Sequence, residues 1–169
     1  MAEPASRSRL RPSLLDRLTD LHPERARETT DDASVNEALL REQVRRDLSW
    51  LFNTTHLAAG TDLAPYPQVG SSILNYGIVS LTGELLSSID SRQLETHVRT
   101  SLLNYEPRLL PESLEVSVRL GKSSFGTAAL VIDIRADLHS EPLPLALYVR
   151  TEIDVETGRV HVGDANKGH

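Results

Sequence analysis

Residues 105–120 read YEPRLLPESLEVSVRL, and the spacing of the apolar residues changes within this stretch. Before it, apolar residues recur every four positions from Leu94 to Leu102, which predicts one buried face of an α-helix. Pro107 ends that helix, because the residue before a proline is pushed out of the helical region. From Leu114 onward every second residue is apolar, which predicts a half-buried β-strand. The chain therefore passes from helices to strands at this point.

Three more alternating runs predict three further strands, within residues 128–138, 145–153 and 160–162. The connections between the runs are short enough for hairpins, so a meander is the economical topology. The residues expected to face the core of this sheet are Leu114, Val116, Val118, Leu120, Ala128, Leu130, Ile132, Ile134, Ala136, Leu138, Leu145, Leu147, Val149, Thr151, Ile153, Val160 and Val162.

A long amphipathic helix is predicted to follow Ser34. This serine forms an S-x-x-E capping box with Glu37, in which each side chain satisfies a free backbone N–H. Trp50 falls just off the apolar stripe, so we expect it at the edge of the core rather than in a binding site. The stripe consists of Leu40, Val44, Leu48, Leu51 and Phe52.

A second long helix is capped either by Asp90 together with Gln93, or by Ser91 alone. Glu95 and Arg99 are available as an exposed pair one turn apart. Because helices come first and strands afterwards, the sequence predicts an α+β fold. The N-terminal helices are expected to pack on one face of a mainly antiparallel four-stranded sheet.

The chain divides into three predicted parts. Residues 1–33 form a mobile N-terminal arm, which contains a short leucine-rich anchor helix and a linker. Residues 34–163 form a single α+β domain, and residues 164–169 form a disordered tail. One core is expected from 169 residues.

The anchor helix of the arm begins after Ser13, a capping residue, and ends before Pro23. Its leucines lie on one stripe, and two explanations are open. The stripe folds back onto the domain, or it anchors the chain in a groove of another subunit. These leucines are Leu14, Leu15, Leu18 and Leu21.

The composition of the chain excludes several classes of function. The formal charge of −6 argues against a general nucleic-acid binder, since phosphate binding needs clustered Lys and Arg. The absence of cysteine excludes a disulfide framework, and the histidines show no ligand spacing, so we expect no metal and no cofactor. No apolar run resembles a signal peptide or a membrane span. We therefore expect a cytoplasmic protein without direct membrane insertion.

Three short motifs carry a resemblance to a known family. They are Asn75-Tyr76-Gly77, Leu81-Thr82-Gly83 and Glu106-Pro107-Arg108-Leu109. At this spacing the chain resembles the small baseplate wedge subunits of contractile injection machines, a family long labelled "lysozyme-like". Within that family, Leu14-Leu15-Asp16-Arg17-Leu18 resembles the type VI secretion version, TssE. The family commonly has Phe in place of Tyr105, and this change adds only a hydroxyl.

The resemblance implies a structural protein and not an enzyme. Such subunits sit in a baseplate at the cytoplasmic side of the inner membrane, with the wedge proteins TssF and TssG. Their fold is similar to the domain by which sheath subunits join, so they can offer the first docking point for the sheath subunits TssB and TssC. The Glu-Pro-Arg motif is implicated in that docking, which here means Glu106, Pro107 and Arg108. Strand addition at a free sheet edge is a second route to the same docking.

The chemistry of the motif permits two roles. Pro107 restricts the directions in which Glu106 and Arg108 leave the helix end, so the two charges can set the register with a partner. Alternatively, Glu106 and Arg108 form an internal ion pair that closes the helix end onto the sheet. The sequence leaves both open.

Two other functions were considered. A peptidoglycan-cleaving enzyme needs two carboxyl groups facing each other across a cleft, and the candidates are Glu84, Glu106 and Asp62. Nothing in the sequence supplies the apolar pocket that would raise the pKa of one of them. A stress-response anti-adaptor of the same fold is the other alternative.

Overall fold

The computed structural model of the chain describes residues 9–10, 13–19, 23–24, 37–80, 90–122, 128–141, 143–154 and 157–164. In these residues the predicted α+β fold is confirmed. The elements are β1 (Arg9–Leu10), α1 (Leu14–Leu18), α2 (Glu37–Phe52), η1 (Leu57–Ala59), η2 (Ile73–Asn75), α3 (Ser91–Tyr105), β2 (Glu115–Lys122), β3 (Ala128–Leu138), β4 (Ser140–Glu141), β5 (Leu145–Asp154) and β6 (Val160–Asp164). Predicted features outside the described residues are Leu21, Ser34, the Leu81-Thr82-Gly83 motif, Glu84 and residues 165–169 of the tail.

The predicted meander is confirmed. Four strands lie in the order β2-β3-β5-β6, and each is antiparallel to its neighbour. One row of paired residues crosses the sheet from Val118 through Ile132 and Thr151 to Val162. Ile132 and Thr151 in this row are completely buried. The row therefore lies on the core side of the sheet.

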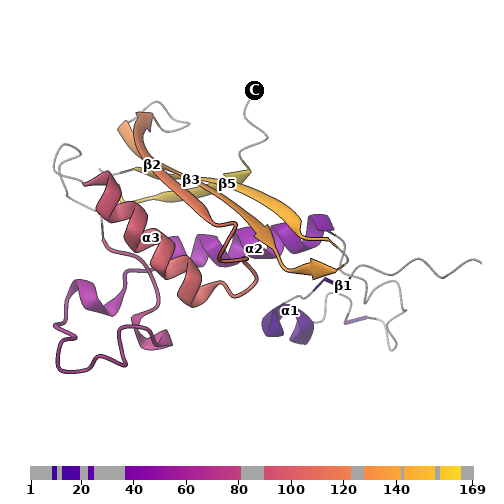
Figure 1. Cartoon of the computed structure of the whole chain (residues 1–169), viewed down its shortest axis with the longest axis horizontal. Helices are drawn as coiled ribbons and strands as arrows, with labels where there is room; N and C mark the ends of the chain where they lie inside the picture. The colour runs from indigo at the N-terminus through magenta and orange to yellow at the C-terminus, as the bar shows by residue number, and fades with distance from the viewer. Residues whose placement is uncertain are drawn as a thin grey trace, which may run out of the picture.

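Helices α2 and α3 lie against that same face of the sheet (Figure 1). α2 contacts β5 and β6, whereas α3 contacts β2. Asp90 caps α3 by accepting the N–H groups of Arg92 and Gln93. Burying each large apolar side chain contributes roughly 1.5–3 kcal/mol to folding. The predicted stripes are buried, namely Leu40, Val44, Leu48, Leu51 and Phe52 of α2 and Leu94, Val98 and Leu102 of α3.

Two residues predicted to face the core are exposed. Leu120 keeps 56% of its surface accessible, and Ala128 on the paired strand is also exposed. Both lie toward the outer end of the β2–β3 hairpin, which extends past α3 (Figure 1). Alternation places a side chain on one face of a strand, but it does not show where the covering helix ends.

The predicted pair between Glu95 and Arg99 is wrong. The Glu95 carboxylate instead accepts the backbone N–H of Val118 at 2.8 Å. Arg99 donates to the carbonyls of Pro111, at 3.1 Å, and of Leu114. Both side chains of α3 thus bind backbone groups at or beside the outer edge of β2. If Glu95 and Arg99 paired with each other, these backbone groups would lose their side-chain partners.

A second, two-stranded sheet was not predicted. β1 pairs with β4 through Arg9 with Glu141 and Leu10 with Ser140. Strands of two residues show no periodicity, so the sequence carried no signal for them. The pairing holds the segment before α1 beside the chain that follows β3.

The Asn75-Tyr76-Gly77 motif holds together the irregular segment that follows α2, from residue 53 to residue 77. The side chain of Asn75 accepts the N–H of Ala58 and donates to the carbonyl of Gly70, each at 2.9 Å. Gly77 has a φ of 125°, and a Cβ there would lie 2.4 Å from the Thr54 carbonyl oxygen. Only glycine fits this position.

We expect Gly77→Ala to lower the free energy of unfolding by at least about 2 kcal/mol, because the added methyl group meets backbone at a positive φ. Urea denaturation followed by circular dichroism measures the change. The matched control is Gly60→Ala, where a Cβ meets nothing within 4 Å. Equal stabilities for the two variants would contradict the assigned conformation of Gly77.

Candidate functional site

The Glu106-Pro107-Arg108 turn joins the end of α3 to the end of β3. α3 ends at Tyr105, as Pro107 predicts, and the N–H of Glu106 donates to the Leu102 carbonyl at 2.9 Å. The Arg108 carbonyl accepts the N–H of His139 at 2.8 Å. The turn is therefore fixed by backbone hydrogen bonds at both ends.

Glu106 and Arg108 form an internal ion pair. Their exposed fractions are only 4% and 9%. Arg108 Nε donates to Glu106 Oε1 at 2.7 Å, and Arg108 Nη2 donates to Glu106 Oε2, so the contact is bidentate. The Arg108 backbone N–H also donates to Glu106 Oε1, at 3.1 Å. Of the two roles that the sequence left open, the structure shows the internal pair.

Helix α2 adds Arg46 and Asp47 to this pair. Arg108 Nη2 donates to Asp47 Oδ2. Arg46 donates to Asp47 Oδ1 through Nε at 2.9 Å and through Nη2 at 2.7 Å. The charges of α2 and of the turn thus form one network, although 61 residues separate Asp47 from Arg108 in sequence.

Helix α1 contributes the third carboxylate, Asp16. Its Oδ1 accepts from Arg46 Nη1 at 2.7 Å, and its Oδ2 lies 3.9 Å from Arg108 Nη1. Ser13 caps α1 as predicted, since its hydroxyl accepts the Asp16 N–H. We call Asp16, Arg46, Asp47, Glu106 and Arg108 the charge cluster.

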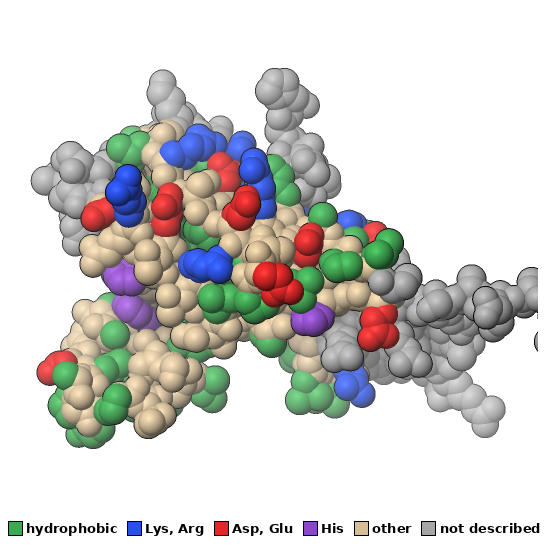
Figure 2. Space-filling model, in the orientation of Figure 1, with side chains coloured by type: hydrophobic (Ala, Val, Ile, Leu, Met, Phe, Trp, Pro, Cys, Tyr) green, Lys and Arg blue, Asp and Glu red, His purple; other side chains and the backbone are tan. Residues whose placement is uncertain are grey.

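The leucines of α1 are mostly exposed. Leu14, Leu15 and Leu18 are 68%, 50% and 75% exposed, and α1 buries no residue. They form a hydrophobic surface patch (Figure 2). The helix is shorter than predicted and ends at Leu18, with Thr19 as its cap. α1 therefore lies against the domain through Asp16, and its apolar stripe stays available to a partner.

The contacts within the charge cluster shift the pKa values of Asp16 and Arg108 in the direction that favours their charged forms. Burial by itself would raise the pKa of Asp16, but hydrogen bonds from Arg46 and Ser13 and the nearby arginine charges lower it below its ordinary value. Burial by itself would lower the pKa of Arg108, but Glu106 and Asp47 raise it above its ordinary value. Asp16 and Arg108 therefore stay ionised at neutral pH.

A groove of about 640 Å³ lies beside the cluster, between α1 and the end of α3. The rings of Tyr76 and Tyr105 meet edge to face on its wall, with 5.3 Å between their centroids. Trp50, expected at the core edge, is 48% exposed and lies under the Arg46 guanidinium, 4.8 Å from the ring centroid. The residues lining the groove are Ser13, Leu14, Leu15, Asp47, Trp50, Tyr76, Tyr105, Glu106, Pro107, Arg108 and His139.

Comparison with family models identifies the protein class. The model of the family described as baseplate wedge protein gp25 matches residues 38–143, which is more than half of the chain. The chain belongs to the gp25 baseplate wedge family. No significant match was found among curated proteins or among solved structures. The resemblance inferred from the short motifs is confirmed at the level of this family.

The gp25 family is mainly structural, so the chain is a structural component of a baseplate. Among the residues that the structure describes, no helix combines the length and the hydrophobicity needed to cross a bilayer. Within the gp25 match, the groove residues Tyr76 and Pro107 lie in motifs that the sequence singled out. Arg46 and Asp47 were not predicted as site residues. They lie on the polar side of the predicted helix, and the sequence does not show which distant residues contact that side.

Two of the three carboxylates named for a lysozyme-like reaction lie in the described residues, and each of them is bound by a neighbouring group of the chain. Glu106 is held on both oxygens by Arg108, so it is not a free acid. Asp62 accepts the backbone N–H of Ala64 at 3.0 Å, as in a local turn. Glu84 lies outside the described residues.

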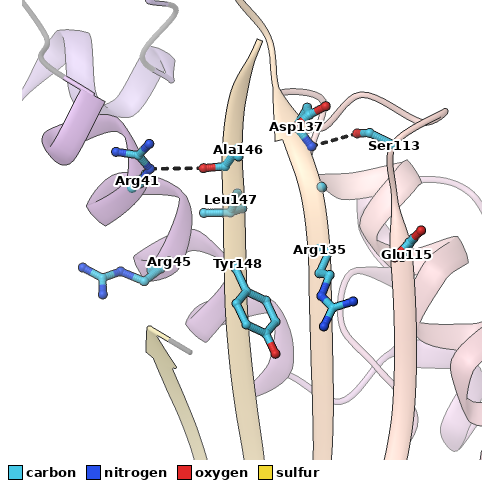
Figure 3. Close-up of a pocket in the computed structure, with 10 residues that line it drawn as sticks. Arg41, Arg45, Ser113, Glu115, Arg135, Asp137, Ala146, Leu147 and Tyr148 are labelled. Carbon is cyan, nitrogen blue, oxygen red and sulfur yellow. Dashed lines mark hydrogen bonds between the residues drawn. The ribbon is translucent and has the colours of Figure 1, made fainter. Parts of the chain in front are cut away.

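A second hollow, of about 740 Å³, lies where β5 extends beyond β6 (Figure 3). β6 pairs with β5 only from Val149 onward, so within the described residues the first part of β5 has β3 as its one strand partner. Arg41 of α2 donates from Nε to the Ala146 carbonyl at 3.2 Å. Arg135 lies over the Tyr148 ring, 5.1 Å from its centroid. The hollow thus combines a strand edge with arginine side chains.

We expect Arg108→Ala to lower the free energy of unfolding by about 3 kcal/mol or more, because Glu106 would remain buried without its partner. Urea denaturation of the purified chain measures the loss. Arg119→Ala is the control, since Arg119 pairs with Asp133 at a half-exposed site and its removal should cost about 1 kcal/mol or less. If Arg108→Ala cost no more than this control, the charge cluster would not hold the fold.

Proposed function

We propose that this gp25-family chain works in a type VI secretion baseplate, as TssE subunits do, and docks the contractile sheath onto the wedge complex. Its partners are then the wedge proteins TssF and TssG and the sheath subunits TssB and TssC. The site of action is the cytoplasm, at the cytoplasmic side of the inner membrane. The chain acts by presenting rigid surfaces, without catalysing a reaction and without a cofactor. Family membership supports the baseplate part of this proposal.

One observation carries the proposal furthest. The leucines of α1 and the Glu106-Pro107-Arg108 turn were predicted separately as partner-binding segments, and Leu14, Leu15 and Pro107 line one groove. Buried Glu106 and Arg108 fix the turn from inside, while Pro107 stays exposed. Exposed apolar side chains on a rigid frame are typical of protein interfaces. A partner therefore contacts the leucines and the proline, and the charges set the shape of that surface.

The sheet edges offer a second contact. On the β2 side, Glu95 and Arg99 of α3 already bind backbone groups at or beside the edge. On the β5 side, residues 145–148 lie beyond the paired part of β6, and the Ala146 carbonyl faces away from β3 toward Arg41. An extended strand from a sheath subunit could add to this edge through main-chain hydrogen bonds. We propose the β5 edge as the place of strand addition.

The two alternatives have less support. A peptidoglycan-cleaving enzyme would need a free acid, and Glu106, the buried candidate among the residues that the structure describes, is ion-paired. Release of soluble fragments from purified murein by the isolated chain would revive that alternative. An anti-adaptor of this fold gives no role to the exposed leucines of α1, which the docking proposal uses.

The triple variant Leu14→Ser, Leu15→Ser and Leu18→Ser should fail to co-purify with TssF and TssG, with a loss of at least about tenfold in captured wedge protein. Its thermal stability should match wild type, because these side chains are mostly exposed. Leu120→Ser, at a 56% exposed position on β2, is the control and should capture normally. Normal capture by the triple variant would rule out α1 as the anchor.

Ala146→Pro should leave the chain folded and block assembly of TssB and TssC on the baseplate. In an antiparallel strand the N–H and the carbonyl of one residue point to the same side, so the N–H that is removed faces away from β3. Leu120→Pro is the matched change on the β2 edge. Sheath length in electron micrographs measures the effect. A block by Leu120→Pro but not by Ala146→Pro would move strand addition to β2.

A further inference from the structure

One guanidinium nitrogen in the charge cluster is not satisfied. Arg108 Nη1 is buried, and among the described residues it has no hydrogen-bond partner. The nearest carboxylate oxygen from α1, Asp16 Oδ2, stays 3.9 Å away. Leaving a buried charged donor without an acceptor costs free energy. Arg108 Nη1 can therefore donate a further hydrogen bond to a carboxylate.

Asp16 does not supply that bond, because its Oδ2 is held by Ser13, the residue that caps α1. Ser13 Oγ donates to Asp16 Oδ2 at 2.6 Å, and the same hydroxyl accepts the Asp16 N–H. Oδ2 is thus held toward the start of α1, and only Oδ1 reaches an arginine, Arg46, at 2.7 Å. A carboxylate on a segment without this serine could bridge Arg46 and Arg108.

Asp16 is also the carboxylate of the cluster with the weakest attachment to the fold. Asp47 lies within the long helix α2, and Glu106 lies in a turn fixed by backbone hydrogen bonds. α1 has five residues and buries none of them. Its contacts with the cluster pass through one side chain, so Asp16 can leave without disturbing the hydrophobic core.

We propose that Arg46 and Arg108 form an exchangeable carboxylate-binding site, in which Asp16 is the internal ligand and an Asp or Glu of a partner protein is the external one. The partner segment carries apolar residues next to its acid, because the walls of the adjoining groove include Trp50, Tyr76 and Pro107. Release of Asp16 removes the ion pairs that join α1 to the charge cluster, while β1 keeps the segment before α1 paired with β4, so binding at this site and engagement of the leucines are coupled. The identity of the partner as a baseplate protein rests on the proposed function; the carboxylate site itself does not.

The site can be tested on the isolated full-length chain. Trp50 is the single tryptophan, and it contacts Arg46, so its fluorescence reports on occupancy. The probe is a peptide with blocked ends and the sequence PALLDRLT, which is that of residues 12–19 with the change Ser13→Ala and contains one carboxylate. The control peptide, PALLNRLT, lacks it. Both are titrated into wild type and into Asp16→Asn.

The acidic peptide should bind Asp16→Asn at least about tenfold more tightly than wild type, whose site is filled by its own Asp16. The control peptide should bind Asp16→Asn at least about tenfold more weakly than the acidic one, because one charged hydrogen bond is lost. Arg46→Gln in the Asp16→Asn background should remove the difference between the peptides. Equal affinities of wild type and Asp16→Asn for the acidic peptide would overturn the proposal.

Two further outcomes are decisive. If Asp16→Asn lowers the unfolding midpoint substantially, Asp16 is a structural residue and not an exchangeable ligand, and the proposal fails. If wild type forms dimers in sedimentation experiments and Asp16→Asn does not, the external ligand is α1 of a second copy, which overturns the assignment to a partner protein. Neither result bears on the proposed docking of this chain to the wedge proteins, which the triple leucine variant tests separately.

Discussion

The structure depends on one constraint, which is that the Arg108 guanidinium is buried and must be surrounded by carboxylates. Moving a charge out of water costs several kcal/mol, and only well-placed opposite charges offset that cost. Glu106 is two residues away, whereas Asp47 and Asp16 come from α2 and α1. The hydrogen bonds of Arg108 therefore require the turn and α2 to meet in one arrangement, and Asp16 of α1 adds a longer ion pair. The hydrophobic core holds α2 and α3 on the sheet, and the charge cluster fixes how their ends meet.

This constraint also fixes the surface that we propose as the docking site. The turn at Pro107 is fixed by hydrogen bonds to Leu102 and His139, and the ion pair fills the space beneath it. Tyr105 bonds back to the carbonyls of Ser72 and Asn75, which ties the irregular segment to the same place. The groove walls outside α1 consequently come from separate parts of the chain but are joined to one another by hydrogen bonds. A preorganised surface loses less entropy when a partner binds.

The sequence predicted the helices and strands in which apolar residues recur at regular spacing. It did not predict the contacts between residues that are distant in sequence. Helices α2 and α3 and the four-stranded meander follow from regular apolar spacing, and Pro107 marks the end of α3. The Glu95 and Arg99 pair failed because helix spacing ignores what an adjacent strand edge can accept. For the site, the motif residues were found, but the meeting of Asp47 with Arg108 across 61 residues was not. Ion pairs between distant segments depend on the fold as a whole.

The motif that we propose for partner binding is mostly buried. Arg108 donates hydrogen bonds from Nε to Glu106 and from Nη2 to Asp47, so these two nitrogens are not available to a partner. What the motif presents outward is Pro107, whose position the ion pair determines. What remains for recognition by charge is Nη1, which faces α1 rather than the core carboxylates. In the proposed exchange, one arginine therefore serves both purposes: Nε and Nη2 hold the fold, and Nη1 binds the carboxylate that takes the place of Asp16.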